Sequence, residues 1–389
     1  MKCIKLARYL ANCTNAGLSL CDSSESFLQS GFWGSFKARF GWNARSFLIE
    51  WNCESEEESQ PASPAKDSRT APKPLLVIRR PLALGISFAY VPWGPELPPG
   101  FPQDDEARNQ ALIELAKALK PFLPKNTAFV RFDPPWYSEG ACAPPPDIRL
   151  PFVRAGADVQ PPDTVLMDLN QSMESLMENL KSKWRYNARL AQKKGVTVRQ
   201  ADESGLDVFY SLLRQTAKRD GIVIHGIDYY RTLFSQCREY QAKTDGPGLD
   251  LRLYVADHEG ETLAAIVVLH RGKKAVYLYG ASSDRKRNLM APYSLQLKAM
   301  EDAKAAGCAE YDLFGIPPNA DPGHPMAGLY RFKTGFGGRI IHRPGSWDFA
   351  YRPLFAGAFR AAETLRKGWR SRRKGRGEKE AKPQGNTNG

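Results

Sequence analysis

A short segment of cationic and aromatic residues lies among glycines near the end of the chain. Arg331, Phe332 and Lys333 follow one another, and three of the next five residues are glycine. Glycines let a backbone or a substrate approach closely because they carry no side chain. The segment therefore forms a candidate reaction surface with two cations and one aromatic ring.

The residues before this segment predict a strand, a helix and a second strand that would position it. An apolar run over 275–279 predicts the first strand, and a polar turn follows at Gly280. Pro292 and Gly307 mark the start and the end of a helix, and residues 309–314 predict the second strand. This order is typical of half of an acyltransferase-like α/β sheet, so the block suits the movement of an acyl group.

Length and composition predict about two globular domains. The 389 residues exceed one ordinary domain, and 42% of them are hydrophobic, which is enough for well-packed cores. No apolar run reaches the roughly 20 residues of a membrane-spanning helix. Asn12, Thr14 and Asn15 interrupt the first apolar stretch, so we expect no secretion signal and a cytoplasmic protein.

The cysteines and histidines do not show the spacings of a disulfide framework or of a metal site. The seven cysteines are odd in number and include no C-x-x-C pair. The five histidines form no H-x-x-x-H or H-E-x-x-H set. These patterns indicate a reducing compartment and disfavour metal-dependent hydrolysis, and we expect neither a metal nor an organic cofactor.

The net charge of +13 is concentrated at the C-terminus. Residues 366–389 hold nine Lys or Arg and two Glu, a net +7, with almost no apolar residues. This composition predicts a disordered basic tail. The tail could contact the phosphates of RNA or an anionic membrane surface, or it could act only as a solubilising segment. At the other end, residues 1–22 read as a poorly ordered leader.

The remainder of the chain divides into two α/β units. The first spans 23–165, with an acidic and Ser/Pro-rich loop insert at 53–74, and we expect residues 345–365 to complete it. The second spans 166–344 and begins with one long helix over 172–194. Other expected elements are strands at 75–80, 86–91, 127–132 and 195–200, helices at 104–120, 207–219 and 227–240, and a hairpin turning at 258–260.

Eight sequence pieces between residues 27 and 350 occur in one collinear order that resembles a known family. They are Q-S-x-x-W-x-x-x-K (29–37), YVPWGP (90–95), R-x-D-P (131–134), LKSKWRYNARLAQKKGV (180–196), RDGI (219–222), YGASS (279–283), APYxLQ (291–296) and GLYRFKTGFGG (328–338). The chain resembles the Fem (FemAB/FemX-like) family of aminoacyl-tRNA-dependent peptidyltransferases, which build the interpeptide bridge of bacterial peptidoglycan.

The resemblance implies a fold and an activity. The fold would be α/β, with two tandem GNAT-like acyltransferase domains and the murein precursor in the cleft between them. Residues 240–250 leave room only for a short loop, so the coiled-coil arm of some members is not expected. The activity would be transfer of Gly, Ala or Ser from aminoacyl-tRNA to a side-chain amine of the stem peptide, without a covalent enzyme intermediate.

The expected partners follow from the same resemblance. They are aminoacyl-tRNA and either UDP-MurNAc-pentapeptide or the lipid-linked murein precursor. A lipid-linked acceptor would bring the protein to the inner face of the membrane as a peripheral contact. We expect a monomer. The basic and aromatic residues of 172–194 could contact tRNA phosphates, although a solvated helix face explains them nearly as well.

The resemblance also implies catalytic residues. Lys333 matches the catalytic lysine, whose charge would stabilise the oxyanion and the departing 3′-oxygen of an aminoacyl ester, and Phe332 would support it. Asp133 matches an acidic position discussed as a base, because an acceptor amine with a pKa near ~10 arrives mostly protonated. Alternatively, Lys333 is an ordinary phosphate or surface lysine, and Asp133 only caps a turn.

A second set of residues would bind the substrate. Lys37 matches a lysine that binds the precursor's diphosphate, beside Trp33. His225 stands where many relatives have an arginine, which is a departure from the family pattern, and Tyr229 lies four residues later. The remaining candidates for the cleft, each of which could instead be a packing or surface residue, are Tyr279, Tyr293 and Arg331.

Two other functions stay open. An acyl-CoA-dependent GNAT-type N-acyltransferase would hold the pyrophosphate with a glycine-rich turn at a helix N-terminus. The matching stretch, residues 285–291, contains no glycine, which disfavours coenzyme A. The second alternative is a non-catalytic RNA-binding or envelope-binding relative. The presence of both Lys37 and Lys333 argues mildly against it.

Overall fold

The computed structural model describes residues 5–9, 15–52, 72–243 and 248–380. Most of the predicted 53–74 insert and the last nine residues of the predicted tail lie outside this range. Within the described residues, no helix is long and apolar enough to cross a bilayer.

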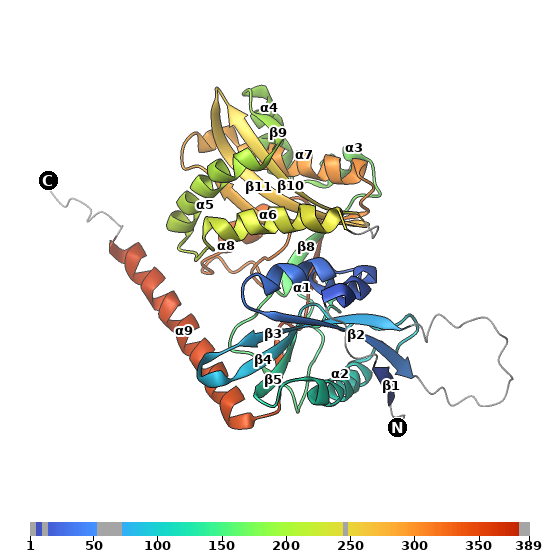
Figure 1. Cartoon of the computed structure of the whole chain (residues 1–389). Helices are drawn as coiled ribbons and strands as arrows, with labels where there is room; N and C mark the ends of the chain where they lie inside the picture. Colours follow the sequence, from blue (N-terminus) through green and yellow to red (C-terminus); the bar gives the residue numbers. More distant parts are fainter. Residues whose placement is uncertain (1–4, 10–14, 53–71, 244–247, 381–389) are drawn as a thin grey trace, which may run out of the picture.

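The first domain is built on a mixed seven-stranded sheet, the lower sheet of Figure 1. Its strand order is β1-β2-β3-β4-β5-β15-β7, and β4 and β5 pair in parallel. β15 comes late in the chain yet pairs with β5 as an antiparallel strand. The strands are β1 (Lys5–Tyr9), β2 (Asn43–Asn52), β3 (Lys73–Pro81), β4 (Ser87–Val91), β5 (Thr127–Phe132), β7 (Val153–Arg154) and β15 (Trp347–Ala350).

The second domain is built on an eight-stranded sheet of order β6-β14-β8-β13-β12-β11-β10-β9. The predicted hairpin joins β10 and β11. β6 comes from the first half of the chain, so each sheet borrows a strand from the other half. The strands are β6 (Ser138–Glu139), β8 (Asp163–Asp168), β9 (Thr197–Ala201), β10 (Leu249–His258), β11 (Glu261–Arg271), β12 (Lys274–Ser282), β13 (Glu310–Asp312) and β14 (Arg339–His342).

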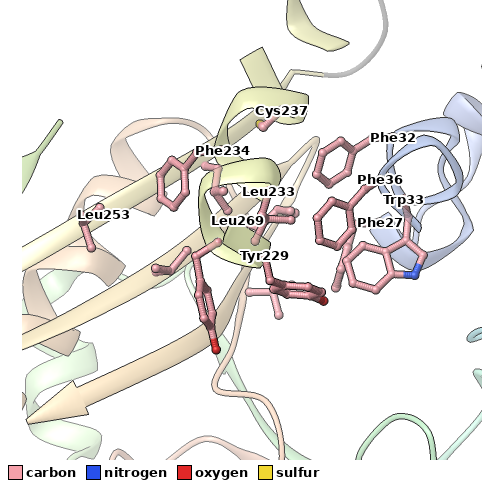
Figure 2. Close-up of a cluster of buried hydrophobic side chains, with 14 of the residues drawn as sticks. Phe27, Phe32, Trp33, Phe36, Tyr229, Leu233, Phe234, Cys237, Leu253 and Leu269 are labelled. Atoms are coloured by element: carbon pink, nitrogen blue, oxygen red, sulfur yellow. The ribbon is translucent and has the colours of Figure 1, made fainter. Parts of the chain in front are cut away.

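Helices cover both sheets and meet where the domains touch. α1 packs against α6, so one apolar cluster runs through the domain contact (Figures 1 and 2). Asp104 caps α2 with a side-chain hydrogen bond, as its position predicts. The helices are α1 (Gly31–Ala38), α2 (Asp105–Leu119), α3 (Met173–Asn179), α4 (Ser182–Lys193), α5 (Leu206–Asp220), α6 (Ile227–Gln241), α7 (Ala291–Ala305), α8 (Ala327–Thr334) and α9 (Pro353–Glu380).

The predicted single helix over 172–194 is wrong, because two helices occupy this range. Leu180 lies between α3 and α4 in an extended conformation, with ψ of 142°. The backbone N–H of Lys181 donates to the carbonyl of Gly335 at 3.0 Å rather than within a helix. A contact with a distant segment therefore overrides a continuous helical pattern, and this break brings α4 to the glycines that follow α8.

Three other predictions differ from the structure. No helix was predicted for the glycine-flanked segment at 331–333, which lies in helix α8. Part of the predicted leader is ordered, because β1 pairs with β2 and Leu18 and Cys21 are buried. The predicted disordered tail is helical up to Glu380 within α9, which Figure 1 shows running along the first domain.

Candidate functional site

β12 and β13 separate after a short parallel pairing in the second sheet. They pair only from Lys274 with Glu310 to Val276 with Asp312. A bulge follows in β12, where the register against β11 shifts next to Leu278. Tyr277 then packs in the cluster with α7, whereas Tyr279 packs in the cluster with α6. The separation leaves an opening between two neighbouring strands.

The side chain of Lys333 occupies this opening. Its ammonium donates to the carbonyls of Phe314 at 2.9 Å and Gly315 at 3.0 Å, just beyond the end of β13. It also lies 5.0 Å from the ring centre of Tyr277 on β12. An ammonium has three N–H donors, so two hydrogen bonds leave one donor for a substrate.

Lys333 is a buried cation without an acidic partner among the described residues. Its side chain is 5% exposed, and no carboxylate lies within 4.0 Å of its ammonium. Burial lowers the pKa of Lys333 to about 7, although Asp312 acts in the opposite direction. A lysine with such a pKa exchanges its proton near neutral pH, which suits a group that stabilises and then releases charge.

Aromatic packing fixes the position of α8 and therefore of Lys333. The indole N–H of Trp184 donates to the carbonyl of Phe332 at 2.8 Å. The ring of Phe332 lies 5.3 Å from that of Tyr293 and 5.3 Å from that of Phe336. Arg331, one residue earlier on the helix, is exposed. The structure thus brings Lys333, Phe332 and Tyr293 together, with Arg331 on the outside.

A cavity of about 790 Å³ opens beside Lys333. Its inner wall holds aromatic rings and Lys333, and its rim holds the cations of residues 285–287 and Arg219. Lys286 and Met290 in the rim adopt left-handed backbone conformations around the start of α7. Such a cavity combines an apolar interior with cations that can meet phosphates. The inner wall includes Tyr277, Tyr293, Gln296, Phe332 and Lys333.

Lys37 lies in a second site, inside a cage of aromatic rings at the domain contact. Its ammonium is 5.1 Å from the ring centre of Trp33, 5.4 Å from that of Trp42 and 5.7 Å from that of Tyr229. Figure 2 shows Trp33 on α1 facing Tyr229 on α6. Burial, together with the charge of Arg80, lowers the pKa of Lys37 to about 8. The rings hold the cation in place.

His225 and two tyrosines extend this second site. The imidazole of His225 stacks on Tyr229 with ring centres 3.9 Å apart. Burial and the charge of Lys37 lower the pKa of His225, which therefore favours its neutral form. The ring of Tyr230 lies between those of Tyr229 and Tyr279, at 5.5 and 5.1 Å. The structure thus brings Trp33, Lys37, His225, Tyr229 and Tyr279 together.

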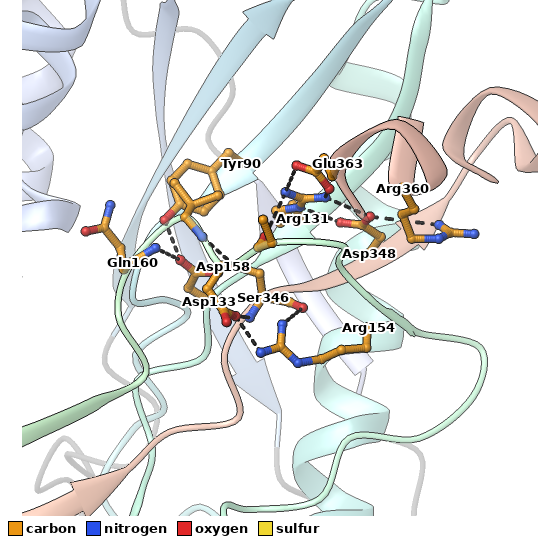
Figure 3. Close-up of polar contacts among 12 residues, drawn as sticks. Tyr90, Arg131, Asp133, Arg154, Asp158, Gln160, Ser346, Asp348, Arg360 and Glu363 are labelled. Atoms are coloured by element: carbon orange, nitrogen blue, oxygen red, sulfur yellow. Dashed lines mark hydrogen bonds and ion pairs between the residues drawn. The ribbon is translucent and has the colours of Figure 1, made fainter. Parts of the chain in front are cut away.

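Asp133 lies apart from both groups, in a polar network of the first domain (Figure 3). Its carboxylate accepts hydrogen bonds from the hydroxyl of Tyr90 at 2.5 Å, the backbone N–H of Gln160 at 3.2 Å and the hydroxyl of Ser346. Burial raises the pKa of Asp133 to about 6. It does not line the 790 Å³ cavity. The structure therefore does not bring Asp133 to Lys333.

Sequence reasoning missed several groups that contact the two lysines. Tyr277 lies over Lys333, and the carbonyls of Phe314 and Gly315 hold its ammonium. Trp42 closes the cage of Lys37. The signal for Tyr277 was present, since it lies two residues before Tyr279 in one strand, but the bulge that turns them to opposite faces leaves no mark in the sequence.

The model of one protein family matches more than half of this chain. The profile described as FemAB family matches residues 151–243 and 252–364. The chain belongs to the FemAB family. This confirms the resemblance that the eight sequence pieces indicated.

Curated relatives are enzymes of staphylococci. The chain is 24% identical over 251 residues to the lipid II:glycine glycyltransferase of Staphylococcus saprophyticus, covering 51% of this chain and 60% of that one. It is 23% identical over 256 residues to the protein of the same name from Staphylococcus aureus strain USA300, covering 51% and 61%. The matched region thus spans about 60% of the length of these relatives.

A solved structure confirms the fold class. The crystal structure of FemX superposes with a TM-score of 0.68 at 18% identity, covering 91% of this chain and 100% of that one. The expected pair of GNAT-like α/β domains is therefore confirmed. α6 ends at Gln241 and β10 begins at Leu249, so no long coiled-coil arm separates them. Among the described residues, no group of three or more His, Cys, Asp or Glu side chains is placed to hold a metal ion.

Proposed function

We propose that this protein transfers an amino acid, most simply glycine, from aminoacyl-tRNA to a side-chain amine of a lipid-linked murein precursor. Lys333 carries the proposal, because a buried lysine without an acidic partner faces a cavity large enough for an aminoacyl ester. The relatives named lipid II:glycine glycyltransferases support glycine as donor and a lipid-linked acceptor.

We assign the donor to the cavity beside Lys333 and the acceptor to the aromatic cage around Lys37. In this proposal the aminoacyl ester of the tRNA lies in the 790 Å³ cavity, with the basic residues 285–287 near its phosphates. Lys37 and the neighbouring His225 bind the diphosphate of the precursor at the domain contact. Tyr279 packs in the cluster with α6 and Tyr293 in the cluster with α7, so in this proposal Tyr279 contacts the precursor and Tyr293 the donor.

The reaction needs one new bond and one broken bond. The acceptor amine attacks the ester carbonyl, an oxyanion forms, and the ester C–O bond breaks. The amine loses one proton and the departing 3′-oxygen gains one, so atoms and charge balance for a neutral amine. The third N–H of Lys333 stabilises the oxyanion, and its pKa of about 7 suits proton transfer to the departing oxygen. Phe332 shields this site from water.

The test is a transfer assay with purified protein, a panel of labelled aminoacyl-tRNAs, and UDP-linked or lipid-linked pentapeptide. We expect label to move from glycyl-tRNA to the lipid-linked precursor. Lys333→Ala should lower kcat by about 10²–10³-fold, the usual effect of removing one donor to an oxyanion. Lys298→Ala is the matched control, because Lys298 is a half-exposed lysine of α7 that does not line the cavity.

Each negative outcome has a distinct meaning. Near-wild-type transfer by Lys333→Ala would refute the role of this lysine. No transfer, with tRNA still bound in a salt-dependent way, would favour a non-catalytic binding protein. No transfer and no tRNA binding would favour coenzyme A thioesters as acyl donors.

A further inference from the structure

Arg343 is a buried cation that the proposed reaction does not use. It directly follows β14 and is 9% exposed. Its Nε and Nη1 atoms are buried without a hydrogen-bond partner, and no carboxylate lies within 4.0 Å of it among the described residues. A guanidinium is rarely buried without hydrogen bonds, because it loses the hydration of its charge. An unpartnered arginine therefore indicates a missing anionic ligand.

Aromatic rings hold Arg343 in place of a counter-ion. Its guanidinium lies 4.1 Å from the ring centre of Trp93 and 6.0 Å from that of Tyr137. Burial lowers the pKa of Arg343, although Asp312 and Glu310 act in the opposite direction from a distance. Stacking on flat rings restricts the planar guanidinium to one orientation, so its N–H groups are arranged in advance for a planar anion.

Arg343 lines a cavity of about 390 Å³ between the two domains. The cavity crosses one face of the second sheet, from Arg343 past β13 to Arg271 at the end of β11. Four strand spacings separate β14 from β11, so the cavity is roughly 19 Å long. Trp93 and Trp136 of the first domain form the opposite wall. An elongated ligand fits this shape better than a compact ion.

The wall of the cavity carries charges of both signs. Arg271, at the far end, is 5% exposed and donates from Nη2 to the carbonyls of Asp22 and Ser24, but its Nε has no partner. Between the two arginines, Glu310 and Asp312 line the floor on β13, and Lys274 of β12 lies beside Glu310 and pairs with Glu25 at 3.2 Å. A polyphosphate would meet these carboxylates and be repelled. A chain that carries both carboxylates and an amine matches this mixture of charges.

We propose that this interdomain cavity binds a short extended peptide, and that Arg343 binds a free carboxylate of that peptide. The identity of the ligand rests on the proposed function, in which the peptide is the stem peptide of the acceptor. A guanidinium fork binds a carboxylate through two parallel hydrogen bonds, which gives both affinity and orientation.

The peptide cavity shares a wall with the site of Lys333. Val276 of β12 lines the peptide cavity, and its neighbour Tyr277 lines the 790 Å³ cavity. Asp312 lines the peptide cavity and accepts from the backbone N–H of Phe314 at 2.7 Å, whose carbonyl in turn holds Lys333. A peptide amine attracted by Asp312 therefore lies at the opening between β12 and β13. Arg343 would act as a positioning residue for that amine.

The test is calorimetric binding of the synthetic stem pentapeptide with L-lysine at position three, and of its two monoamides, one at the C-terminus and one at the glutamate α-carboxyl. Wild-type protein should bind the free acid about 10-fold or more tightly than one of the monoamides, the usual value of a charge-assisted hydrogen bond. Arg343→Met should bind the free acid and the two monoamides equally. Arg199→Met, at an exposed arginine of β9, is the control and should discriminate like wild type.

Three results would overturn the proposal: no heat of binding for the wild type at the highest soluble peptide concentration, equal binding of the acid and both monoamides, or unchanged discrimination in Arg343→Met. Should Arg343→Met not fold, Arg343→Lys keeps the charge without the fork and should lose part of the discrimination. Peptide bound through Arg343 without any transfer would refute only the proposed function. Transfer with unchanged discrimination in Arg343→Met would refute only this inference.

Discussion

Arg131 in the first domain and Lys333 in the second are both buried cations, but only Arg131 is neutralised by carboxylates. Arg131 of β5 is 1% exposed and pairs with Asp348 at 2.7 Å and Glu363 at 2.8 Å, as Figure 3 shows. These carboxylates raise the pKa of Arg131, against the effect of its burial. Lys333 is 5% exposed, donates to two carbonyls and to no carboxylate among the described residues, and has a pKa lowered to about 7.

This difference distinguishes a cation that holds the fold together from a cation that is available for catalysis. Arg131 joins β5 to β15 and to α9, two neighbouring elements whose bonded residues lie 217 and 232 residues later in the chain. The carboxylates in that connection neutralise the charge of Arg131. The charge of Lys333 is not neutralised, because carbonyl groups orient an ammonium but carry no opposite charge. A buried cation left unpaired in this way is available to a ligand or to a transition state.

The largest effect on stability is expected at Arg131. Arg131→Met leaves Asp348 and Glu363 buried or half-buried without their partner, and breaking such a pair costs about 3–5 kcal/mol. Urea unfolding should show this loss in the free energy of unfolding. Arg149→Met, at an exposed arginine paired with Asp147, should leave the unfolding midpoint unchanged. A stable Arg131→Met protein that no longer transfers would contradict the comparison.

A smaller effect on stability is expected at Asp133, which, like Arg131, lies in a buried polar network of the first domain. Its pKa is about 6 in the folded protein and near 3.8 when unfolded. The folded protein binds the proton of Asp133 more tightly than the unfolded chain does, and this stabilises the protein by about 3 kcal/mol at most. The contribution is fully present below about pH 4 and is lost as the pH rises through about 6. The stability difference between wild type and Asp133→Asn, measured by urea unfolding from pH 4 to 7, should shrink accordingly.

The control for Asp133 is the transfer activity of Asp133→Asn, measured under conditions in which the variant is folded. If Asp133 only connects Tyr90, Gln160 and Ser346, Asp133→Asn should keep most of its transfer activity at a temperature where it is folded. A large loss of kcat in a folded Asp133→Asn protein would instead support the predicted role as a base, acting at a site that the present geometry does not bring to Lys333.

The smallest expected effect is at Lys37. Because aromatic rings surround its ammonium, and no carboxylate pairs with it in the part of the chain that the structure describes, it resembles Lys333 more than Arg131. Lys37→Gln should raise the KM for the diphosphate-linked precursor about 10-fold, the effect of losing one charge-assisted contact, with little change in kcat. The free pentapeptide, which lacks the diphosphate, is the matched substrate. Equal loss for both substrates would show that Lys37 only supports packing.

The sequence predicted the domains' elements better than the partners of the buried charges. Hydrophobic periodicity and caps placed α2, α5, α6 and the β10–β11 hairpin, because these signals are local. Arg131 and its partners lie 217 and 232 residues apart, and nothing local distinguishes it from Lys333. The break between α3 and α4 was missed for the same reason, since its cause is a contact with Gly335.

The candidate site was predicted in type but not in arrangement. The motif matches placed Lys37 and Lys333 among aromatic residues, where the structure has them. They did not show that Lys333 fills the gap between two strands, or that Asp133 lies in a separate network. These features depend on the bulge at Leu278 and on the order of strands in each sheet, which form only when distant segments pair.

The central claim is that the unpaired Lys333 supplies the charge for transfer, and the pH dependence of kcat/KM tests it most directly. Transfer requires a neutral acceptor amine, with a pKa near ~10, and a protonated Lys333, with a pKa of about 7. For the wild type, kcat/KM should rise about tenfold per pH unit below pH 7 and then level off, because each gain in free amine is cancelled by the loss of protonated Lys333. Lys333→Arg stays protonated, so its lower kcat/KM should keep rising above pH 7. Identical profiles without a break near pH 7 would contradict the account.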